Sequence, residues 1–440
     1  MLANLEADAI DMKRNLAKIK SPLQVTLFLT EKCNQKCKFC YMNSDYSKRH
    51  APTSKVKKII DECAKADVFE INLSGGEPTL HPDFLDIVKY CKDNNFIVGF
   101  TSNGQFDEKI SKKVSRYIDG CAISIHGFRD THNRIVNKKD SFDQALKNLE
   151  ILSDEGVITQ VDFTLIKDNF ADLYPFGKYI LEGPAHSYAV LRLIPVGRGK
   201  DIPSLTIEEY NKAFSQLYQL KREFPEKVVE LADAFPYCLI KDKKYRELVR
   251  GCSAGIFYAA IDIEGNIKPC PADELIAGNI FEDSLEEIWQ NSEELEKYRE
   301  LKHLPRSCKN CDYLGDCLLG CRASSEEGMD HLLFLQEPSP LRKVLKERKR
   351  KKRKISGKPK LWEHLKIRKD LDGYIIYHPL APVLYVNEVG GEIIKYCNGH
   401  NTLDSISHEI AKKYKINENK IKSDIEKFLL ELGDFIKYEA

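Results

Sequence analysis

Three cysteines near the start of the chain have the type and spacing of ligands to a metal cluster. Cys33, Cys37 and Cys40 lie in the stretch TEKCNQKCKFCYMN, separated by three residues and then by two. Thiolates are the usual ligands of iron-sulfur clusters, and a cubane cluster has four iron corners, so three cysteines would leave one corner open. Zinc sites more often combine C-x2-C pairs into a set of four ligands. The spacing therefore favours an iron-sulfur cluster over zinc or a redox-active cysteine pair.

A second short motif, SGGEP, follows the next apolar run of the chain. It contains Gly75, Gly76, Glu77 and Pro78. Glycine allows the backbone to approach a ligand closely, although Gly-Gly with Pro is also a common turn. The motif directly follows the run VFEINLS, just as the cysteine loop follows LQVTLFLT. If both runs are parallel strands, their carboxyl ends share one edge of a sheet, and the two motifs should lie at the same mouth.

Six more cysteines form a second group. They are Cys252, Cys270, Cys308, Cys311, Cys317 and Cys321, the last four spaced C-x2-C-x5-C-x3-C. Six ligands fit two clusters better than one structural zinc, which is the alternative. The leftover cysteines are expected to be small buried apolar residues, with a role as ligand or hydrogen donor open only for Cys238. These leftover residues are Cys63, Cys91, Cys121, Cys238 and Cys397.

Strand-like and helix-like segments alternate over the region that contains the first cysteines. Six apolar runs occur between about Leu23 and Val196: LQVTLFLT, VFEINLS, FIVGFTS, CAISIHG, ITQVDFTLI and YAVLRLIPV. The segments between them place apolar residues on one helical face, as Val56, Ile59 and Ile60 do. This order predicts an α/β fold with a parallel sheet covered by helices, closed into a partial (β/α)6 barrel of the TIM type. A helical stretch should follow to about Phe235.

The rest of the chain divides into three further parts. We expect a core barrel in residues 1–235, a cysteine-rich domain in 236–340, a basic linker in 341–360 and a small winged-helix-like domain in 361–440. The last of these shows a hairpin signal at Asp372-Gly373, a third short strand VLYVN and three helix-like segments.

Composition limits the possible partners. Lys and Arg number 68 against 67 Asp and Glu, so net charge gives no reason to expect a nucleic acid or a membrane. No run of about 18 apolar residues occurs, and the first 20 residues form an amphipathic pattern without a signal-peptide core, so we expect a cytoplasmic protein with reduced thiols. The basic run 346–354 is interpreted as a solvated linker, with attraction for an acidic peptide or nucleic acid as alternatives.

The first motifs resemble the radical S-adenosylmethionine (SAM) superfamily. The C-x3-C-x2-C signature matches Cys33, Cys37 and Cys40, with Phe39 before the third cysteine, and SGGEP matches the motif that holds the amino group of SAM. The resemblance implies a [4Fe-4S] cluster with SAM, bound by Phe39, Gly75, Gly76, Glu77, Pro78, Asn103 and Ser124. His126 and Val136-Asn137 depart from the pattern and receive no role. The implied activity is formation of a 5′-deoxyadenosyl radical, with ferredoxin or flavodoxin as electron donor.

The second cysteine group resembles the SPASM domain, which holds auxiliary iron-sulfur clusters. The resemblance implies that Cys252, Cys270 and Cys321 serve one cluster, and that Cys308, Cys311 and Cys317 serve the other. The family usually supplies one more cysteine soon after this run, and the segment LLFLQEPSP contains none. Each cluster therefore lacks an identified fourth ligand; Asp316, Glu337 and the substrate are the candidates.

The C-terminal part resembles the PqqD family, also called the RiPP recognition element. Asn387-Glu388, Gly399, Thr402-Leu403, Ile406 and Ile410 carry the likeness. In that family a leader peptide adds a strand to the edge of a sheet. The resemblance implies that VLYVN and the following helix form such a groove.

Together these features predict a radical SAM enzyme that modifies a ribosomally synthesised precursor peptide, bound through its leader. The product could be a thioether, a carbon-carbon crosslink, an epimer or an excision product. One alternative is a radical SAM maturase of a protein residue or a tetrapyrrole. The other is an iron-sulfur redox sensor that binds DNA through the basic run and the winged unit, and it should show strongly salt-dependent binding.

Overall fold

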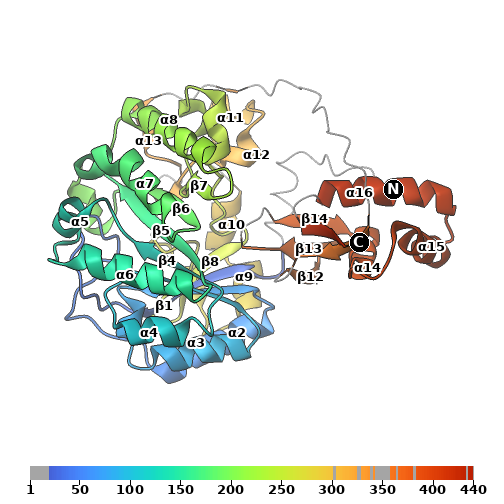
Figure 1. Cartoon of the computed structure of the whole chain (residues 1–440), viewed down its shortest axis with the longest axis horizontal. Coiled ribbons are helices and arrows are strands. Elements are labelled where there is room, and N and C mark those ends of the chain that lie inside the picture. The colour runs from blue at the N-terminus through green and yellow to red at the C-terminus, as the bar shows by residue number, and fades with distance from the viewer. Residues whose placement is uncertain are drawn as a thin grey trace. The chain divides into compact units, whose positions relative to one another are not determined.

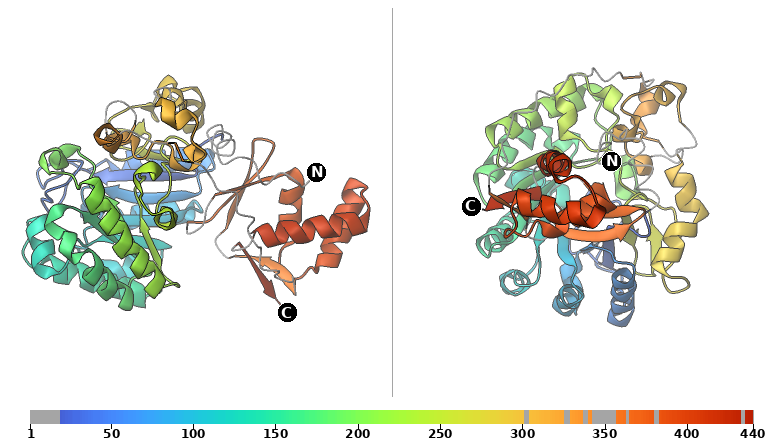
Figure 2. Two further views of the ribbon diagram at one scale, coloured as in Figure 1. Left: turned by 90° about the horizontal axis from the view of Figure 1, so that it is seen from above. Right: turned by 90° about the vertical axis from the view of Figure 1, so that its right-hand side faces the viewer.

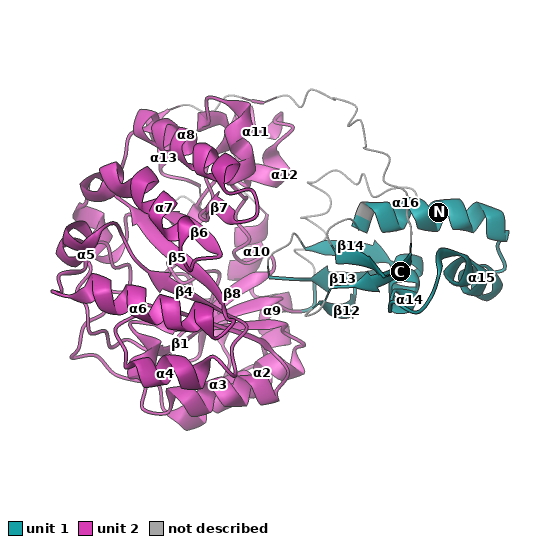
Figure 3. Cartoon of the chain, in the orientation of Figure 1, with its two compact units in different colours: residues 1–20, 344–440 teal, residues 21–343 magenta. Residues whose placement is uncertain are grey.

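The structure, a computed structural model, describes residues 19–300, 304–324, 329–336, 340–341, 357–362, 365–379, 383–432 and 435–439. Residues 1–18, Glu337 and the basic run 346–354 lie outside these ranges. The chain divides into two compact units, one of residues 21–343 and one of residues 1–20 with 344–440 (Figure 3). Each unit is described by itself.

The larger unit contains a sheet whose order, within the described residues, is β10-β9-β8-β1-β2-β3-β4-β5-β6-β7. The six predicted strands are confirmed as β1 Gln24–Thr30, β2 Glu70–Gly75, β3 Ile97–Ser102, β4 Gly120–Ser124, β5 Ile158–Leu165 and β6 Ser187–Arg192. Every neighbouring pair among them is parallel. The register starts with Gln24 opposite Glu70, and all carboxyl ends meet at one edge of the sheet.

Four further strands extend this sheet beyond the predicted barrel. β7 (Val228–Leu231) pairs in parallel with β6, in a segment for which the sequence predicts helix. β8 (Tyr258–Ile261) pairs in parallel with β1, and β9 (Asn266–Lys268) and β10 (Gly278–Asn279) add antiparallel strands. The cysteine-rich region thus continues the core sheet.

Helices follow the strands and lie around the outside of the sheet (Figures 1 and 2). They are α2 Thr53–Lys65, α3 Phe84–Asp93, α4 Glu108–Val114, α5 Arg129–Val136, α6 Ser141–Asp154, α7 Leu173–Glu182 and α8 Ile207–Glu223. The predicted face of α2 is buried, since Val56, Ile59 and Ile60 are fully inaccessible. Short helices then occupy the cysteine-rich region: α9 Leu285–Asn291, α10 Glu293–Arg299, α11 Arg306–Lys309, α12 Leu314–Cys317 and α13 Leu332–Leu335.

The smaller unit has the predicted hairpin, third strand and three helices. Its sheet order is β12-β13-β14, made of Lys366–Asp370, Gly373–Tyr377 and Leu384–Asn387, all antiparallel. The helices are α14 Glu388–Tyr396, α15 Leu403–Tyr414 and α16 Glu418–Leu432. A second pair, β11 (Lys358–Leu361) with β15 (Ile436–Glu439), was not predicted.

Two glycines allow α14 to pack closely within this unit. A Cβ at Gly391 would lie 2.0 Å from the ring of Tyr374 on β13, and one at Gly390 would lie 3.2 Å from Phe428 on α16. Asn387 caps the helix, since its side chain accepts a hydrogen bond from the Gly390 N–H at 2.9 Å. The short GG segment therefore fixes the helix against the sheet.

No described helix is both long and apolar enough to cross a membrane.

A buried ion pair joins the end of β6 to the cysteine-rich region. Arg192 and Asp330 are both inaccessible, and the guanidinium binds the carboxylate through both terminal nitrogens. Burial alone would lower the pKa of Arg192, but the Asp330 charge raises it overall. Asp330 also accepts hydrogen bonds from the N–H groups of Cys321 and Leu332. The pair thereby positions a cysteine of the second group.

Replacing Asp330 with Asn should destabilise the larger unit by about 3–5 kcal/mol, because the Arg192 charge would stay buried without its counter-ion. Urea unfolding measures the change. Glu182→Gln is the control, because its pair with Lys178 is exposed and should be worth less than about 1 kcal/mol. Equal stabilities for the two variants would contradict this role of the pair.

Candidate functional site

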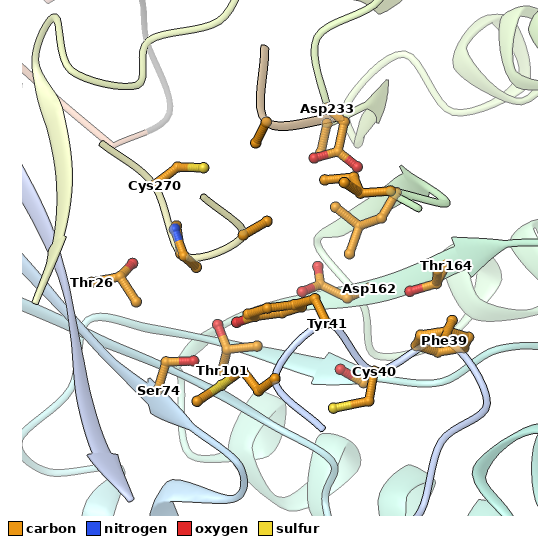
Figure 4. Close-up of a pocket in the computed structure, with 18 of the residues that line it drawn as sticks. Thr26, Phe39, Cys40, Tyr41, Ser74, Thr101, Asp162, Thr164, Asp233 and Cys270 are labelled. Atoms are coloured by element: carbon orange, nitrogen blue, oxygen red, sulfur yellow. The ribbon is translucent and has the colours of Figure 1, made fainter. Parts of the chain in front are cut away.

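A cavity of about 480 Å³ lies at the carboxyl ends of the barrel strands (Figure 4). Its lining includes the ends of β2, β3, β4 and β5, namely Ser74, Ser102, Ser124 and Thr164. Six patterned cysteines also line it: Cys33, Cys37, Cys40, Cys252, Cys270 and Cys321. The structure thus brings the first cysteine loop and half of the second cysteine group to one space.

The SGGEP motif packs directly against the start of the cysteine loop. A Cβ at Gly75, whose φ is +131°, would lie 2.2 Å from the Thr30 carbonyl, and one at Gly76 would lie 2.2 Å from the Lys32 carbonyl. The Gly76 N–H donates to the Thr30 carbonyl at 2.8 Å, and the Glu77 N–H donates to the Lys32 carbonyl at 2.7 Å. Only glycine permits this approach, and both glycines line the cavity.

Glu77 points into the protein and holds the loop that follows β3. Its carboxylate accepts hydrogen bonds from the Ser102 hydroxyl and the Asn103 N–H, each at 2.8 Å, and from Thr79. Burial raises the pKa of Glu77, while these hydrogen bonds oppose the shift. Glu77 and Pro78 do not line the cavity, in contrast to Gly75, Gly76 and Asn103. Glu77 therefore holds the backbone of Asn103 in position and does not itself reach the cavity.

Arg198 holds the cysteine loop from the other side. It lies in the segment after β6, and its Nε donates to the Cys37 carbonyl at 2.8 Å while its NH1 donates to the Ser44 carbonyl at 3.0 Å. The neighbouring Gly197, with φ of +54°, lies so close to the loop that a Cβ would be 2.5 Å from the Cys40 carbonyl. No local pattern indicates this contact, because the two residues are 161 positions apart in the chain.

In the first loop Cys33 is buried and Cys37 and Cys40 are half-buried, and the three thiols lie close to one another. Burial raises the pKa of Cys33 to about 11, and it also raises the pKa of Cys37, with the neighbouring thiols adding to both effects. Asn103 donates from its side chain to the Cys33 sulfur at 3.5 Å. A metal cluster would reverse this protonation, since a coordinated thiol loses its proton. Free thiolates would be costly here without such a positive partner.

The second set of thiols on the cavity wall has an arginine beside it. Burial raises the pKa of Cys270 to about 12, with Cys252 as the next cause. The buried Arg322 lies next to Cys252, stacks 3.8 Å from the centroid of Tyr298 and donates to the Ala254 carbonyl at 3.0 Å. A guanidinium in this position favours negatively charged sulfur.

A histidine without a predicted role packs beside the cysteine loop. The ring of His126 lies 4.7 Å from that of Phe39 in an edge-to-face arrangement, and its Nδ1 accepts the Thr164 N–H at 3.1 Å. Burial, with His132 nearby, lowers the pKa of His126 well below its usual value. Both Phe39 and His126 line the cavity. Because Nδ1 accepts the Thr164 N–H, the proton of the neutral imidazole is on Nε2, which can donate one hydrogen bond at this wall without adding charge.

Two carboxylic acids face the same space (Figure 4). Burial raises the pKa of Asp162 to about 6 and that of Asp233 to about 6, and the nearby Asp233 charge adds to the effect at Asp162. Asp162 accepts a hydrogen bond from Gln160 at 2.7 Å, and Asp233 accepts the Arg192 N–H at 2.9 Å. These acids can gain or lose a proton near neutral pH. No motif pointed to them.

Tyr41 extends into the cavity between the two sets of thiols (Figure 4). Burial raises its pKa, and the charges of both Cys40 and Cys270 contribute, so the phenol lies near each set. Tyr258, close to Tyr41 and Cys270, shares a hydrogen bond of 2.9 Å with Thr26.

The other three patterned cysteines lie outside this cavity. Cys308, Cys311 and Cys317 line a second, smaller pocket together with Cys238, the one leftover cysteine for which a role as ligand or hydrogen donor stayed open. Among the described residues, no three His, Cys, Asp or Glu side chains are gathered tightly enough to hold a single metal ion. The ligands of a cubane cluster need no such convergence, because each binds a different iron.

Comparison with known proteins agrees with this arrangement. Family models match in order: the radical SAM superfamily at residues 27–175, an iron-sulfur cluster-binding domain (SPASM) at 252–312 and coenzyme PQQ synthesis protein D (PqqD) at 374–434. The mycofactocin maturase MftC of Mycolicibacterium smegmatis is 30% identical over 318 residues, which cover 70% of this chain and 79% of that protein. The chain belongs to the radical SAM superfamily.

Two further comparisons extend this assignment. The AdoMet-dependent heme synthase of Methanosarcina barkeri is 27% identical over 328 residues, which cover 70% of this chain and 93% of that protein. A crystal structure of Streptococcus suis SuiB bound to S-adenosylmethionine has a TM-score of 0.59 at 18% identity, covering 71% of this chain and 76% of SuiB. SuiB shares the fold, and the predicted partial barrel is thereby confirmed.

The site of this radical SAM enzyme fits its cofactors. The thiols of the first loop suit a [4Fe-4S] cluster. The exposed backbone at Gly75 and Gly76 and the side chain of Asn103 suit SAM beside it. Two further groups of thiols suit auxiliary iron-sulfur clusters. When bound, these groups supply one-electron chemistry able to remove a hydrogen atom from an unactivated carbon.

Glu77→Gln should weaken SAM binding about tenfold, because the amide cannot accept from both Asn103 and Ser102, and a hydrogen bond to a charged group is worth about 1.5–3 kcal/mol. Calorimetric titration of the anaerobic holoprotein measures the change. The control is Asp61→Asn, which removes a carboxylate hydrogen-bonded to Tyr90 on the surface helices. Unchanged affinity in Glu77→Gln would show that Asn103 is held by other means.

Asp162→Asn should become more stable relative to the parent as the pH rises. The folded-state pKa of Asp162, about 6, lies above the ordinary 3.8, so its contribution is complete below that ordinary value and is lost as the pH rises through about 6. The relative gain between about pH 4 and pH 7.5 is on the order of 2–3 kcal/mol, measured by urea unfolding.

The exposed Asp45 provides a control of opposite sign. Hydrogen bonds from Ser47 lower its pKa, so Asp45→Asn should lose stability relative to the parent as the pH rises through the acidic range. Parallel curves for the two variants would contradict the assigned protonation of Asp162.

Proposed function

We propose that this radical SAM enzyme modifies a ribosomally made precursor peptide, whose leader binds the smaller unit. The observation that carries the proposal is the match to PqqD at residues 374–434 in the same chain as the radical SAM and SPASM matches. The name of MftC, a mycofactocin maturase, supports a maturation activity. We also propose the domain boundaries given above, at residues 235, 340 and 360.

Cys33, Cys37 and Cys40 hold the [4Fe-4S] cluster in this proposal. Gly75, Gly76, Asn103, Ser124 and Phe39 line the space beside those thiols and bind SAM through backbone and side-chain contacts. Glu77 positions Asn103 through its N–H and takes no direct part. Pro78 starts the short helical turn Pro78–Leu80 and fixes the backbone after the glycines.

The cavity must exclude water from the reacting carbon while it holds the substrate. Leu191, Leu193 and Ile194 provide apolar wall, and Asp162 and Asp233 provide groups that can hold a proton at their carboxylate oxygens. A peptide N–H or an amine of the substrate is the natural partner for these acids. The oriented substrate then presents one C–H bond to the cofactor.

Cys252, Cys270 and Cys321 hold an auxiliary cluster that faces the substrate. They line the same cavity as the first loop, and the other described cysteines on its lining are those of that loop, Cys33, Cys37 and Cys40. Tyr41 lies between the two sets of thiols. We propose that this cluster accepts an electron from the substrate or binds it at an open iron.

The edge strand β14 is the proposed leader site. Within the described residues it pairs only with β13, so its outer edge can pair with an extended peptide. α14 packs beside it and supplies the second wall of the groove. Because the leader and the modified segment belong to one peptide, binding here raises the effective concentration of substrate at the barrel.

A ferredoxin or flavodoxin as electron donor and a cytoplasmic location complete the proposal. The cytoplasm keeps cysteines reduced, so they can bind iron-sulfur clusters there. The electron donor would reduce the first cluster.

Cys37→Ala should abolish reductive cleavage of SAM, because two thiolates cannot hold the cluster in place of three. Chromatography of 5′-deoxyadenosine after anaerobic incubation with dithionite measures the activity. Cys63→Ala, which changes a buried cysteine on α2, serves as the control. Persistent 5′-deoxyadenosine from Cys37→Ala would refute the assignment of the loop.

The substrate class is tested with the peptide encoded by a short reading frame beside the gene. Anaerobic incubation with the reconstituted enzyme, SAM and reductant should change the mass of this peptide, and a leaderless version should react far more slowly. A tetrapyrrole substrate is the competing outcome, favoured by the similarity to heme synthase. Conversion of an iron porphyrin, with no change in the peptide, would replace the peptide proposal.

Proline at the β14 edge should weaken leader binding. Successive N–H groups of an edge strand point alternately inward and outward, so either Leu384→Pro or Tyr385→Pro removes an outward donor without breaking the pairing to β13. The variant that folds normally should lose about tenfold in affinity for the labelled peptide. Ile367→Pro on the opposite edge strand β12 is the matched control; equal losses in both strands would contradict β14 as the site.

A further inference from the structure

The second, smaller pocket contains one cysteine besides the three that match the family pattern. Its lining comprises Pro236, Tyr237, Cys238, Cys308, Cys311, Leu314, Cys317, Leu319, Leu333 and Leu341. Cys308 lies in α11, Cys317 ends α12, and Cys311 lies between them. Cys238 comes from the short helical turn Tyr237–Leu239, seventy positions before Cys308. Four thiols and apolar side chains therefore enclose one space.

The four sulfur atoms are close enough to influence one another. Burial raises the pKa of Cys308 to about 11, and Cys238 is the next cause, ahead of Cys311. Burial likewise raises the pKa of Cys317 to about 12, with Cys238 and Cys308 adding to it. Cys238 therefore lies near both Cys308 and Cys317, in agreement with its place on the lining of the same pocket.

Backbone donors point at two of these sulfurs. The Tyr237 N–H donates to the Cys317 sulfur at 3.4 Å, and the Leu341 N–H donates to the Cys311 sulfur at 3.4 Å. Such N–H···S contacts stabilise the thiolate form and tune iron-sulfur clusters. Because Tyr237 precedes Cys238 directly, the same turn supplies a hydrogen bond to one thiol and a fourth thiol.

The position of Cys238 is held by its neighbours. The Tyr237 hydroxyl donates to the Val249 carbonyl at 2.9 Å, and its ring packs 6.0 Å from that of Tyr313, which lies between Cys311 and Cys317 in sequence. Arg246 in turn stacks 5.1 Å from the Tyr313 ring. The turn that carries Cys238 is thus fixed against the cysteine run.

We infer that Cys238 is the fourth ligand of the second auxiliary cluster, and that it replaces the downstream cysteine this chain lacks. On binding, Cys238 releases its thiol proton to solvent and its sulfur bonds to the iron that Cys308, Cys311 and Cys317 leave free. Four thiolates complete a cubane cluster, so neither Asp316 nor Glu337 is needed.

The two auxiliary sites then differ in function. The thiols of Cys252, Cys270 and Cys321 face the substrate cavity with one position open, whereas the second site is closed by protein ligands and apolar side chains. A fully ligated cluster cannot bind substrate, so the second cluster carries electrons or stabilises the fold. The inference rests on the presence of auxiliary clusters and not on the identity of the substrate.

Cysteine alkylation tests the ligand directly in the unaltered chain. The anaerobic holoprotein is treated with iodoacetamide before and after removal of iron with a chelator, and each cysteine is followed by mass spectrometry. Cys238 should be protected in the holoprotein and should become reactive together with Cys308, Cys311 and Cys317. Alkylation of Cys238 in the holoprotein, with those three still protected, would overturn the inference.

Cys238→Ala and Cys238→Ser give a second readout. The alanine variant should lose between about one and four iron atoms per chain and should show a changed electron paramagnetic resonance (EPR) signal of one auxiliary cluster. The serine variant should keep the cluster at a shifted reduction potential. Cys397→Ser is the matched control, since Cys397 donates to the Ile393 carbonyl, a bond that serine can keep.

The outcomes separate the possible failures. SAM should still perturb the EPR signal of the first cluster in the Cys238 variants, which shows that the barrel is folded. Iron content and EPR signals equal to the parent would exclude Cys238 as a ligand. If a variant does not fold, the alkylation pattern decides. If the unaltered protein contained only about four iron atoms per chain, it would hold one cluster and no auxiliary clusters. That result would overturn this inference but would not affect the proposal that the enzyme modifies a peptide.

Discussion

The site depends on holding an irregular loop of three thiols against the end of a parallel sheet. The loop has little regular structure of its own, so backbone contacts position it. Gly75 and Gly76 let the end of β2 touch the carbonyls of Thr30 and Lys32, and Arg198 reaches the Cys37 carbonyl from the opposite side. Because the loop is clamped between β2 and the segment after β6, its sulfurs face a cavity and the lining stays in place.

Burial raises the pKa values of the acidic groups that line this cavity. It raises the pKa of Cys33 to about 11, which keeps that thiol neutral at pH 7, and it raises the pKa of Asp162 and of Asp233 to about 6, so these carboxylic acids become neutral only below that pH. Positive clusters shift the thiols to thiolates, while the acids remain able to exchange protons near neutral pH. The Arg192–Asp330 pair joins the barrel to the segment that carries Cys321, and one compact unit contains both groups of thiols.

Local patterns in the sequence predicted the strands, the order of the domains and the sharing of one mouth by two motifs. These predictions were confirmed because the spacing of cysteines and glycines depends on the local geometry of the backbone. Local patterns carry no information about contacts between segments that are far apart in the sequence. The sequence left a ligand role for Cys238 open but could not assign it to a cluster, because the turn that brings it to Cys308 arises only from tertiary packing. Asp162 and Asp233 lie in or beside ordinary strands, and β7 and β8 were missed because their short runs lack the length of the six predicted strands.

The most direct test of the account is the EPR spectrum of the reduced anaerobic holoprotein with SAM that carries isotopic labels on its methionine carboxylate and amine. The account predicts that the cluster of the Cys33, Cys37 and Cys40 loop shows magnetic coupling to these labels, because its fourth iron binds them. A spectrum without such coupling, or a loop that contains zinc, would contradict it.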